Sequence, residues 1–320
     1  MSGPVAGREV ADRAVGRRTA LRLGGAAVLG ALGTAGSLFA LGQAETVPGL
    51  LPTPNEFWTE HDPWVPDRSP RRSRGPVEAI SLYSAFRPGP LTRILVMAPP
   101  GGDPAAPGGL PVCLVLHGRG ARAHDAFLLR MPGFLADAVA DGVPPFALVA
   151  VDAGSSYYHP RADGSDTFRM LTDDVLPLLA RRGWGTGPDR RFAVLGWSMG
   201  GYGALLFAQT LGPDRLAAAV ASSPSLWTTF RAAPEGVFDS QDDYDRYDVY
   251  AGRDRMHDVA VRVDTALGDQ YLPAVRQFLD GCDPRPAGGF APGAHNRRFW
   301  RRRLPGQLGF VGEHLRDGRR

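Results

Sequence analysis

The sequence contains no lysine, and all 36 of its basic residues are arginine. Against 33 acidic residues they leave a formal net charge of only +3 over 320 residues. So small an excess does not favour a nucleic-acid-binding protein, which needs a concentrated basic surface. Arginines do cluster near the C-terminus, where an exposed helix face explains them better than a partner site: Arg297, Arg298, Arg301, Arg302 and Arg303.

Cysteine is scarce as well, because the chain has only Cys113 and Cys282. Two cysteines cannot form the disulfide framework that stabilises small secreted folds. Cys113 lies in the apolar run 111–116 and is predicted to be a small buried hydrophobe, whereas Cys282 follows a predicted helix, and a bridge between them is not favoured. With 43% hydrophobic residues, the chain is instead long and apolar enough for one large domain and an appendage.

The first 44 residues are predicted to be a targeting segment rather than part of the fold. Arg17 and Arg18 precede an uncharged stretch, 23–41, that is rich in alanine, glycine and leucine. This pattern resembles a twin-arginine export signal. The stretch is long enough to remain as a membrane anchor, but its glycines make it weakly hydrophobic and favour a signal. We therefore expect an exported, extracytoplasmic protein that meets the twin-arginine translocase, with membrane or cell-envelope association left open.

Residues 45–76 contain seven prolines and are predicted to form an extended linker with little regular structure. Residues 77–320 are predicted to form one domain that begins with two strands, 77–86 and 91–98. Strands and helices then alternate, which predicts an α/β fold with a parallel sheet covered on both faces. Further strands are expected at 112–116, 146–151, 191–195, 216–221 and 259–267, and helices at 123–140, 166–182, 204–210, 271–279 and 297–315, the last interrupted near Pro305.

The pentapeptide Gly196-Trp197-Ser198-Met199-Gly200 has the G-x-S-x-G pattern and lies between a predicted buried strand and a predicted helix. In that context the pattern predicts a sharp turn that exposes the serine in a strained conformation, with glycines where the two backbones leave no room for a Cβ atom. The helix N-terminus beside it can stabilise an oxyanion. Ser198 is therefore predicted to be a nucleophile. A serine in an ordinary tight turn is the alternative, which the flanking strand and helix disfavour.

A serine nucleophile needs a histidine base and an acid, and in this kind of fold the chain order is serine, acid, histidine. Of seven histidines, only His257, His295 and His314 follow Ser198. His257 precedes the strand that should carry the acid, and His314 lies in the last helix near the chain end. His295 follows a glycine-rich loop, 288–294, that can present its imidazole, so His295 is predicted to be the general base.

The acid is expected just beyond the strand 259–267, where Asp269 lies in a Gly-Asp turn. Asp264 is the rival, but its position inside the strand disfavours it. An N-cap for the helix that starts near Tyr271 is the alternative role for Asp269.

An oxyanion hole needs two backbone N–H groups. Met199, which follows the predicted nucleophile, is expected to supply one. Arg119, in the loop after the strand 112–116, is expected to supply the other, and the glycines on both sides of it let that backbone approach Ser198. His117, at the start of this loop, is predicted to be structural.

Five segments of the chain carry a family resemblance: LVLHGRG, GWSMGGYGALLFA, ASSPSLW, Gly268-Asp269, and Ala294-His295 before Phe299-Trp300. Together they resemble the putative-esterase branch of the α/β-hydrolases, which is similar to esterase D (S-formylglutathione hydrolase) and to the secreted mycolyltransferases. The resemblance covers residues 77–315. It implies an α/β-hydrolase fold with an eight-stranded, mostly parallel sheet, no metal or organic cofactor, and a segment 223–227 that borders the active site. Arg119 stands where close relatives are expected to have an apolar residue.

Five aromatic residues are predicted to contact the substrate: Trp197, Tyr157, Tyr158, His159 and Trp227. The alternative for Tyr157, Tyr158 and His159 is that they hold their own loop against the core. Residues 228–258 match neither named relative. Their mixture of aspartates and aromatics predicts a cap-like insertion after the sixth strand that acts as a lid, aromatic inward and acidic outward, with a surface excursion as the alternative.

These features predict an exported serine hydrolase that cleaves a small-molecule, lipid or carbohydrate ester through an acyl-enzyme on Ser198. An acyltransferase that moves the acyl group to a sugar or glycerol hydroxyl is the rival with the same chemistry. A catalytically inactive cell-envelope binding protein is the rival from another class, and the presence of Ser198, Asp269 and His295 argues against it.

Overall fold

The structure is a computed structural model that describes residues 68–89 and 91–316. The predicted targeting segment and most of the predicted linker lie outside these residues. The end of the linker, 68–76, has no helix or strand and lies along helix α2 (Met131–Ala140), where the backbone N–H of Arg71 donates to Asp137 (2.8 Å) and its guanidinium pairs with Asp141 (2.5 Å). Within the described part of the chain, no helix is long and apolar enough to cross a membrane.

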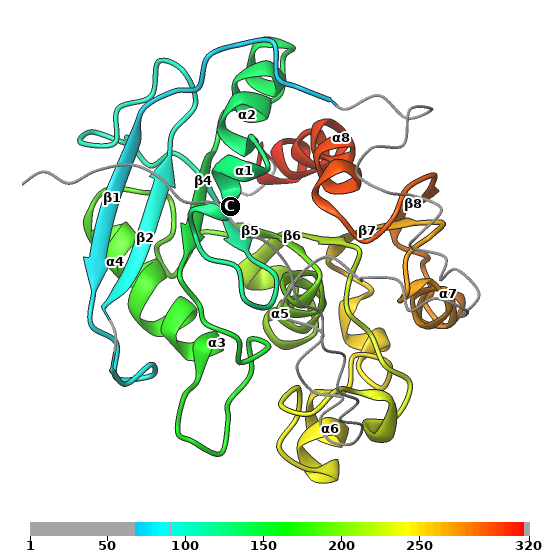
Figure 1. The fold of residues 1–320 in the computed structure, drawn as a ribbon. Coiled ribbons are helices and arrows are strands. Elements are labelled where there is room, and N and C mark those ends of the chain that lie inside the picture. Colours follow the sequence, from blue (N-terminus) through cyan, green and yellow to red (C-terminus); the bar gives the residue numbers. More distant parts are fainter. Residues whose placement is uncertain (1–67, 90, 317–320) are drawn as a thin grey trace, which may run out of the picture. The chain divides into compact units, whose positions relative to one another are not determined.

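One sheet of eight strands forms the centre of the domain (Figure 1). Its spatial order is β1-β2-β4-β3-β5-β6-β7-β8. β1 pairs antiparallel with β2 and β2 with β4, while all other neighbours are parallel, so the expected mostly parallel sheet is confirmed. The strands are β1 (Val77–Leu82), β2 (Thr92–Met97), β3 (Val112–Leu116), β4 (Ala147–Val151), β5 (Phe192–Trp197), β6 (Leu216–Ser222), β7 (Ala260–Ala266) and β8 (Ala287–Ala291).

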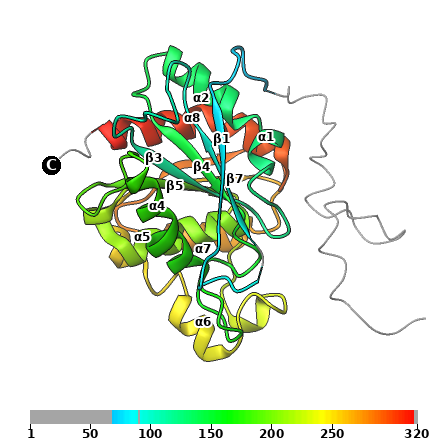
Figure 2. The same cartoon turned by 90° about the vertical axis from the view of Figure 1, so that its left-hand side faces the viewer.

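Helices cover both faces of this sheet, as the alternation of elements predicts (Figure 2). On one face lie α1 (Asp125–Leu128), α2 and α8 (Arg297–Arg316), and their buried residues form one apolar cluster with the strands. On the other face lie α3 (Thr167–Arg169), the π-helix η2 (Met170–Val175), α4 (Leu176–Arg181), α5 (Met199–Arg215) and α7 (Leu272–Asp280). All residues of β3 to β6 are buried, which accounts for their uninterrupted apolar sequences.

The insertion, residues 228–258, leaves the sheet after β6 and returns at β7 (Figure 1, yellow). It contains the 3-10 turns η3 (Phe230–Ala232) and η4 (Arg253–Met256) and the short helix α6 (Gln241–Tyr247). Phe238 and Tyr244 are buried whereas Asp242 and Asp245 are exposed. The aromatic residues thus anchor the insertion and acidic residues face solvent. Its action as a lid stays a prediction.

The strand β8 is absent from the sequence prediction, which treats 288–294 as a loop. Gly288 and Gly289 discourage a strand prediction because glycine has low strand propensity. Both have positive φ angles, and a Cβ atom at Gly288 would collide with the carbonyl of Val263 on β7. The close approach of two backbones therefore requires glycine here, and β8 forms because β7 supplies its parallel partner.

The helices also differ from the prediction in two places. Residues 123–140 form two helices, because Arg130 adopts a left-handed conformation (φ 56°) and the second helix begins directly after it, with Pro132 in its first turn. The expected break near Pro305 is wrong, since α8 continues through it. Pro305 removes one backbone donor, but both halves of α8 bury apolar side chains, among them Phe299 and Leu308, and this packing keeps the helix continuous.

Candidate active site

Ser198 lies on a tight turn between β5 and α5. Its backbone is strained, with φ 56° and ψ −119°, and its N–H donates to the carbonyl of Ser222 on β6 (3.0 Å). Cβ atoms at Gly196 and Gly200 would collide with the carbonyl oxygens of Gly200 and Leu116. Both glycines of the G-x-S-x-G pattern are therefore required by backbone contacts, and the turn leaves the Ser198 side chain partly accessible.

The imidazole of His295 lies between Ser198 and Asp269. Its Nε2 is 2.9 Å from Ser198 Oγ and its Nδ1 is 2.9 Å from Asp269 Oδ2. Because a carboxylate only accepts, Nδ1 carries the proton and Nε2 is the acceptor for the serine hydroxyl. The three residues come from the ends of β5, β7 and β8, which meet at the carboxyl edge of the parallel strands.

Asp269 is buried and accepts two hydrogen bonds. Burial alone would raise its pKa, but the attraction and hydrogen bond of His295 and the N–H of Tyr271 on Asp269 Oδ1 (2.9 Å) outweigh it, so the pKa lies below its ordinary value. The His295 ring is held by edge-to-face contacts with Tyr271 (5.2 Å between ring centroids) and Trp300 (5.3 Å). The acid therefore stays ionised at neutral pH beside a fixed imidazole.

Asp264, the rival acid, has a different set of partners. It is fully buried in β7, where Arg262 and Arg303 pair with its two oxygens (2.8 and 2.5 Å) and Gln307 donates to it (3.0 Å). Two guanidinium groups therefore balance its charge, as buried carboxylates require.

The other two candidate histidines lie elsewhere too. His257 is exposed beside Asp258, and Nδ1 of His314 donates to the carbonyl of Phe310. The structure brings none of these residues to Ser198.

The loop after β3 approaches Ser198 where the sequence expects an oxyanion hole. A Cβ atom at Gly118 would lie 3.4 Å from the Ser198 Cβ, and Arg119 is the next residue. Met199 begins α5, where backbone N–H groups have no acceptor within the helix. His117 is buried, its Nδ1 donates to the Gly118 carbonyl (2.8 Å), and its Nε2 accepts from the N–H of Ala153 (3.0 Å).

Burial is the main reason that the pKa of His117 lies below its ordinary value. A neutral imidazole with both nitrogens bonded to the backbone fits the structural role expected for it.

Ser225 is the contact that sequence reasoning missed as an individual residue. Its hydroxyl lies 3.0 Å from Ser198 Oγ and its N–H donates to the Ser198 carbonyl (3.1 Å). The only sequence signal is its place in ASSPSLW, directly after β6.

The predicted substrate contacts divide into two groups. Tyr157 and Trp227 are buried and lie ring against ring (5.6 Å between centroids). Trp227 also lies against Tyr271 (5.6 Å), whose ring contacts the imidazole of His295. Trp197 is buried on the other side, beside Trp300 (6.2 Å), and belongs to the core. Trp197 packs in the apolar cluster on the opposite face of the sheet from Tyr157 and Trp227, so a direct substrate contact by Trp197 is not favoured.

Tyr158 and His159 do not fit the prediction either, because both are fully buried. The hydroxyl of Tyr158 donates to the carbonyl of His117 (2.9 Å). The His159 ring is stacked between Phe238 and Tyr247 of the insertion (5.4 and 4.8 Å). The alternative expectation, that these side chains hold their loop against the core, describes what is observed.

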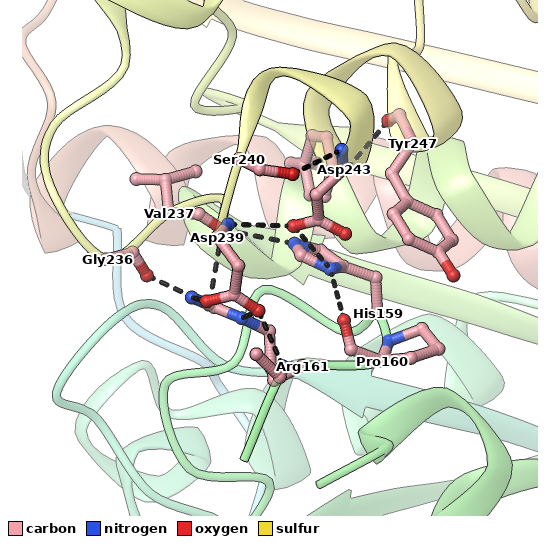
Figure 3. Close-up of polar contacts among 11 residues, drawn as sticks. His159, Pro160, Arg161, Gly236, Val237, Asp239, Ser240, Asp243 and Tyr247 are labelled. Atoms are coloured by element: carbon pink, nitrogen blue, oxygen red, sulfur yellow. Dashed lines mark hydrogen bonds and ion pairs between the residues drawn. The ribbon is translucent and has the colours of Figure 1, made fainter. Parts of the chain in front are cut away.

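A polar clamp joins the loop after β4 to the insertion (Figure 3). Arg161 forms a two-point ion pair with Asp239 (3.0 and 2.6 Å) and donates to the carbonyl of Gly236 (2.9 Å). His159 Nδ1 and Nε2 face the carbonyls of Pro160 and Val237 (2.9 and 3.1 Å).

The ion pair of this clamp shifts the pKa of Asp239. The hydrogen bond from Arg161 is the largest cause that lowers the pKa of Asp239 to about 2. The insertion is therefore fixed to the domain by charge as well as by aromatic packing.

The fold and the site together define a class of protein. A mostly parallel sheet with a strained serine between β5 and α5, followed along the chain by an acid and a histidine that reach it, is the arrangement of an α/β-hydrolase. In the described part of the chain, no group of three or more metal-ligating side chains could hold a metal ion.

Comparison with known proteins places the chain within that class. The family model described as Putative esterase matches residues 89–311, and the chain belongs to this family. Its sequence matches no curated protein.

Solved structures share the fold at low sequence identity. A ferulic acid esterase is 18% identical over 76% of this chain and 100% of that chain, with a TM-score of 0.64. An S-formylglutathione hydrolase from Agrobacterium tumefaciens is 16% identical (77% and 98% covered, TM-score 0.60). A substrate-bound, fluorophosphonate-binding serine hydrolase from Staphylococcus aureus is 19% identical (75% and 99% covered, TM-score 0.58).

Proposed function

We propose that this protein hydrolyses carboxylic esters through an acyl-enzyme on Ser198. One observation carries the proposal: Ser198, His295 and Asp269 form an unbroken line of hydrogen bonds, 2.9 Å at each step, at an accessible turn. A serine hydroxyl is a weak nucleophile unless a base removes its proton, and this line supplies the base and an acid to orient it.

In the first half-reaction, Ser198 Oγ attacks the ester carbonyl carbon and His295 Nε2 accepts the hydroxyl proton. The carbonyl oxygen becomes an oxyanion, which the backbone N–H groups of Met199 and Arg119 stabilise. Asp269 stabilises the imidazolium and keeps its ring in place. His295 then gives the proton to the leaving alkoxide oxygen as the C–O bond breaks, so the alcohol departs and the acyl group remains on Ser198.

In the second half-reaction a water molecule takes the place of the alcohol. His295 removes a proton from the water as its oxygen attacks the acyl carbon, and the same N–H groups hold the second oxyanion. The proton returns to Ser198 Oγ as the acid is released. A sugar or glycerol hydroxyl in place of water would make the protein an acyltransferase with the same residues.

A fluorophosphonate probe tests the nucleophile directly, because it forms a covalent bond only with an activated serine. We expect one adduct per chain on Ser198 and none in S198A, with loss of ester turnover on the order of a millionfold, as in serine-protease triads. Ser81→Ala is the matched control, since Ser81 is exposed on the edge strand β1. An unlabelled wild-type protein would point to the inactive binding protein.

The partition of the acyl group separates hydrolysis from transfer. With a 4-nitrophenyl ester as donor, glycerol or trehalose is added and both products are measured by mass spectrometry. Free acid as the dominant product at every acceptor concentration supports the hydrolase. Saturable formation of the acylated acceptor would instead establish the acyltransferase.

A further inference from the structure

The residue after Gly118 carries a charge that the proposed chemistry does not use. Only the backbone N–H of Arg119 has a role in the oxyanion hole. Its side chain is exposed, although it belongs to the loop that passes directly over Ser198. A guanidinium at this place needs an explanation, because an apolar side chain would leave the backbone N–H in position.

The guanidinium of Arg119 lies among three segments that surround the triad. Its positive charge lies near the hydroxyls of Tyr157 in the loop after β4 and of Tyr271 after β7, and it acts to lower the pKa of both against the raising effect of burial. Its Nη2 is 3.7 Å from where a Cβ atom of Gly236 would stand, so it lies against the insertion. Arg119 therefore spans the space between these segments.

The Tyr271 side of this location is close to the nucleophile. The Tyr271 ring lies against the imidazole of His295 (5.2 Å between centroids), and Nε2 of that imidazole is 2.9 Å from Ser198 Oγ. A substrate whose ester carbonyl lies at Ser198 can therefore place another of its groups between Arg119 and Tyr271.

The charge of Arg119 has no acidic partner among the residues that the structure describes. The contrast with Arg161 is direct, because Arg161 also acts on Tyr157 but is paired with Asp239. A guanidinium has five N–H donors, more than one neighbouring hydroxyl could occupy. The remaining donors, with two tyrosine hydroxyls beside them, form a set that matches a carboxylate.

We infer that Arg119, Tyr157 and Tyr271 form a subsite for a carboxylate carried by the substrate, so that the enzyme prefers anionic esters. The inference rests on the proposed function and names its substrate class. The backbone N–H of Arg119 stabilises the oxyanion of the reacting carbonyl, and its guanidinium binds the carboxylate that distinguishes the preferred substrates. A charge-assisted hydrogen bond of this kind discriminates by about tenfold to a hundredfold.

The test compares esters that differ only in charge. Mono-4-nitrophenyl adipate and 4-nitrophenyl hexanoate place the carboxylate, or a methyl group, on the acyl side. 4-Acetoxybenzoate and its methyl ester do the same on the alcohol side. The readout is the ratio of kcat/KM for the charged ester to that for the neutral ester, because any change in the shared chemistry cancels in this ratio.

In wild type we expect the ratio to exceed one in at least one pair and to fall as salt is raised, since salt screens the attraction. R119M should lower that ratio about tenfold or more and remove its salt dependence, and the pair that responds identifies the side that carries the charge. Arg122→Met is the matched control, because Arg122 is exposed on the same loop and its removal changes the net charge equally. Ratios within threefold of wild type in both pairs for R119M would overturn the inference.

A failure of the proposed function gives a different result. If wild type takes up the fluorophosphonate and cleaves neutral esters, an unchanged ratio refutes only the carboxylate subsite. If no ester is cleaved, calorimetry of monomethyl adipate binding to S198A and to S198A/R119M decides the inference separately. Tenfold weaker binding in the double variant supports the subsite, and equal binding refutes it.

Discussion

Replacing Asp269 by asparagine changes one atom at the centre of the hydrogen-bond line. In the structure Asp269 Oδ2 accepts from His295 and Oδ1 accepts from the backbone N–H of Tyr271, both at 2.9 Å. An ionised carboxylate satisfies two donors, but an amide has one oxygen and one NH₂ group and can satisfy only one of them. The asparagine oxygen can therefore accept from the backbone N–H of Tyr271 or from the imidazole N–H of His295, but not from both.

The two outcomes have different costs. If the amide oxygen faces His295, its NH₂ group opposes the Tyr271 N–H, and one unmet donor costs about 1–3 kcal/mol of stability. If the oxygen faces Tyr271, the NH₂ group meets His295 and moves the imidazole proton to Nε2. A tautomer shift costs less than a donor–donor clash with a backbone that cannot rotate, so we expect the second outcome.

With its proton on Nε2, His295 cannot accept from Ser198. The matching substitution in serine proteases lowers kcat about 10⁴-fold, and we expect a loss of that order in D269N with little change in KM. The assay is turnover of 4-nitrophenyl butyrate, with thermal unfolding to confirm the fold and Asp280→Asn, on the exposed end of α7, as the control. Retention of more than about a tenth of wild-type kcat by folded D269N would refute the assignment of the acid.

Three further predictions concern the turn, the clamp and export. G200A places a Cβ atom against the Leu116 carbonyl, so we expect the Tm to fall by several °C and the ester-cleaving activity to be lost. An unchanged Tm would contradict this backbone contact. Asp239→Asn should cost about 1 kcal/mol, or a few °C, at neutral pH. The pKa of Asp239 falls from 3.8 to about 2 on folding. The contribution of ionised Asp239 to the free energy of unfolding is therefore complete above about pH 4 and is lost as the pH falls through about 2. At that low pH the difference in Tm between wild type and variant should vanish. Arg17→Lys with Arg18→Lys should leave the protein in the cytoplasm, and normal export on cell fractionation would exclude a twin-arginine signal.

The parts of the fold that depend on short stretches of sequence were predictable. The tight turn at Ser198 follows from its own five residues, because Gly196 and Gly200 are required where the backbones of β5, the turn and the end of β3 come close together. The chain order of serine, acid and histidine also excludes His257, and the predicted position of His314 in the last helix leaves His295. Each of these signals is local or is an order along the chain, and neither needs the position of a distant segment.

The parts that failed depend on distant partners. β8 was missed because its glycines give no strand signal, and the edge of β7 makes the strand. His159 is predicted from the sequence to contact the substrate, but its ring is enclosed by Phe238 and Tyr247 of the insertion, 79 and 88 positions later in the chain. The continuity of α8 through Pro305 depends on packing against the sheet. Sequence patterns cannot show which distant segment covers a side chain.

The distance along the chain between Ser198 and His295 has a consequence for when the nucleophile becomes active during synthesis and folding. The two atoms that must meet are 2.9 Å apart in space and 97 positions apart in sequence, and the base comes second. Synthesis proceeds from the N-terminus, and domains fold as their chain emerges. A growing chain therefore carries its nucleophile without a base until β8 and the start of α8 are made. A chain that is interrupted before His295 therefore carries a serine that no base activates.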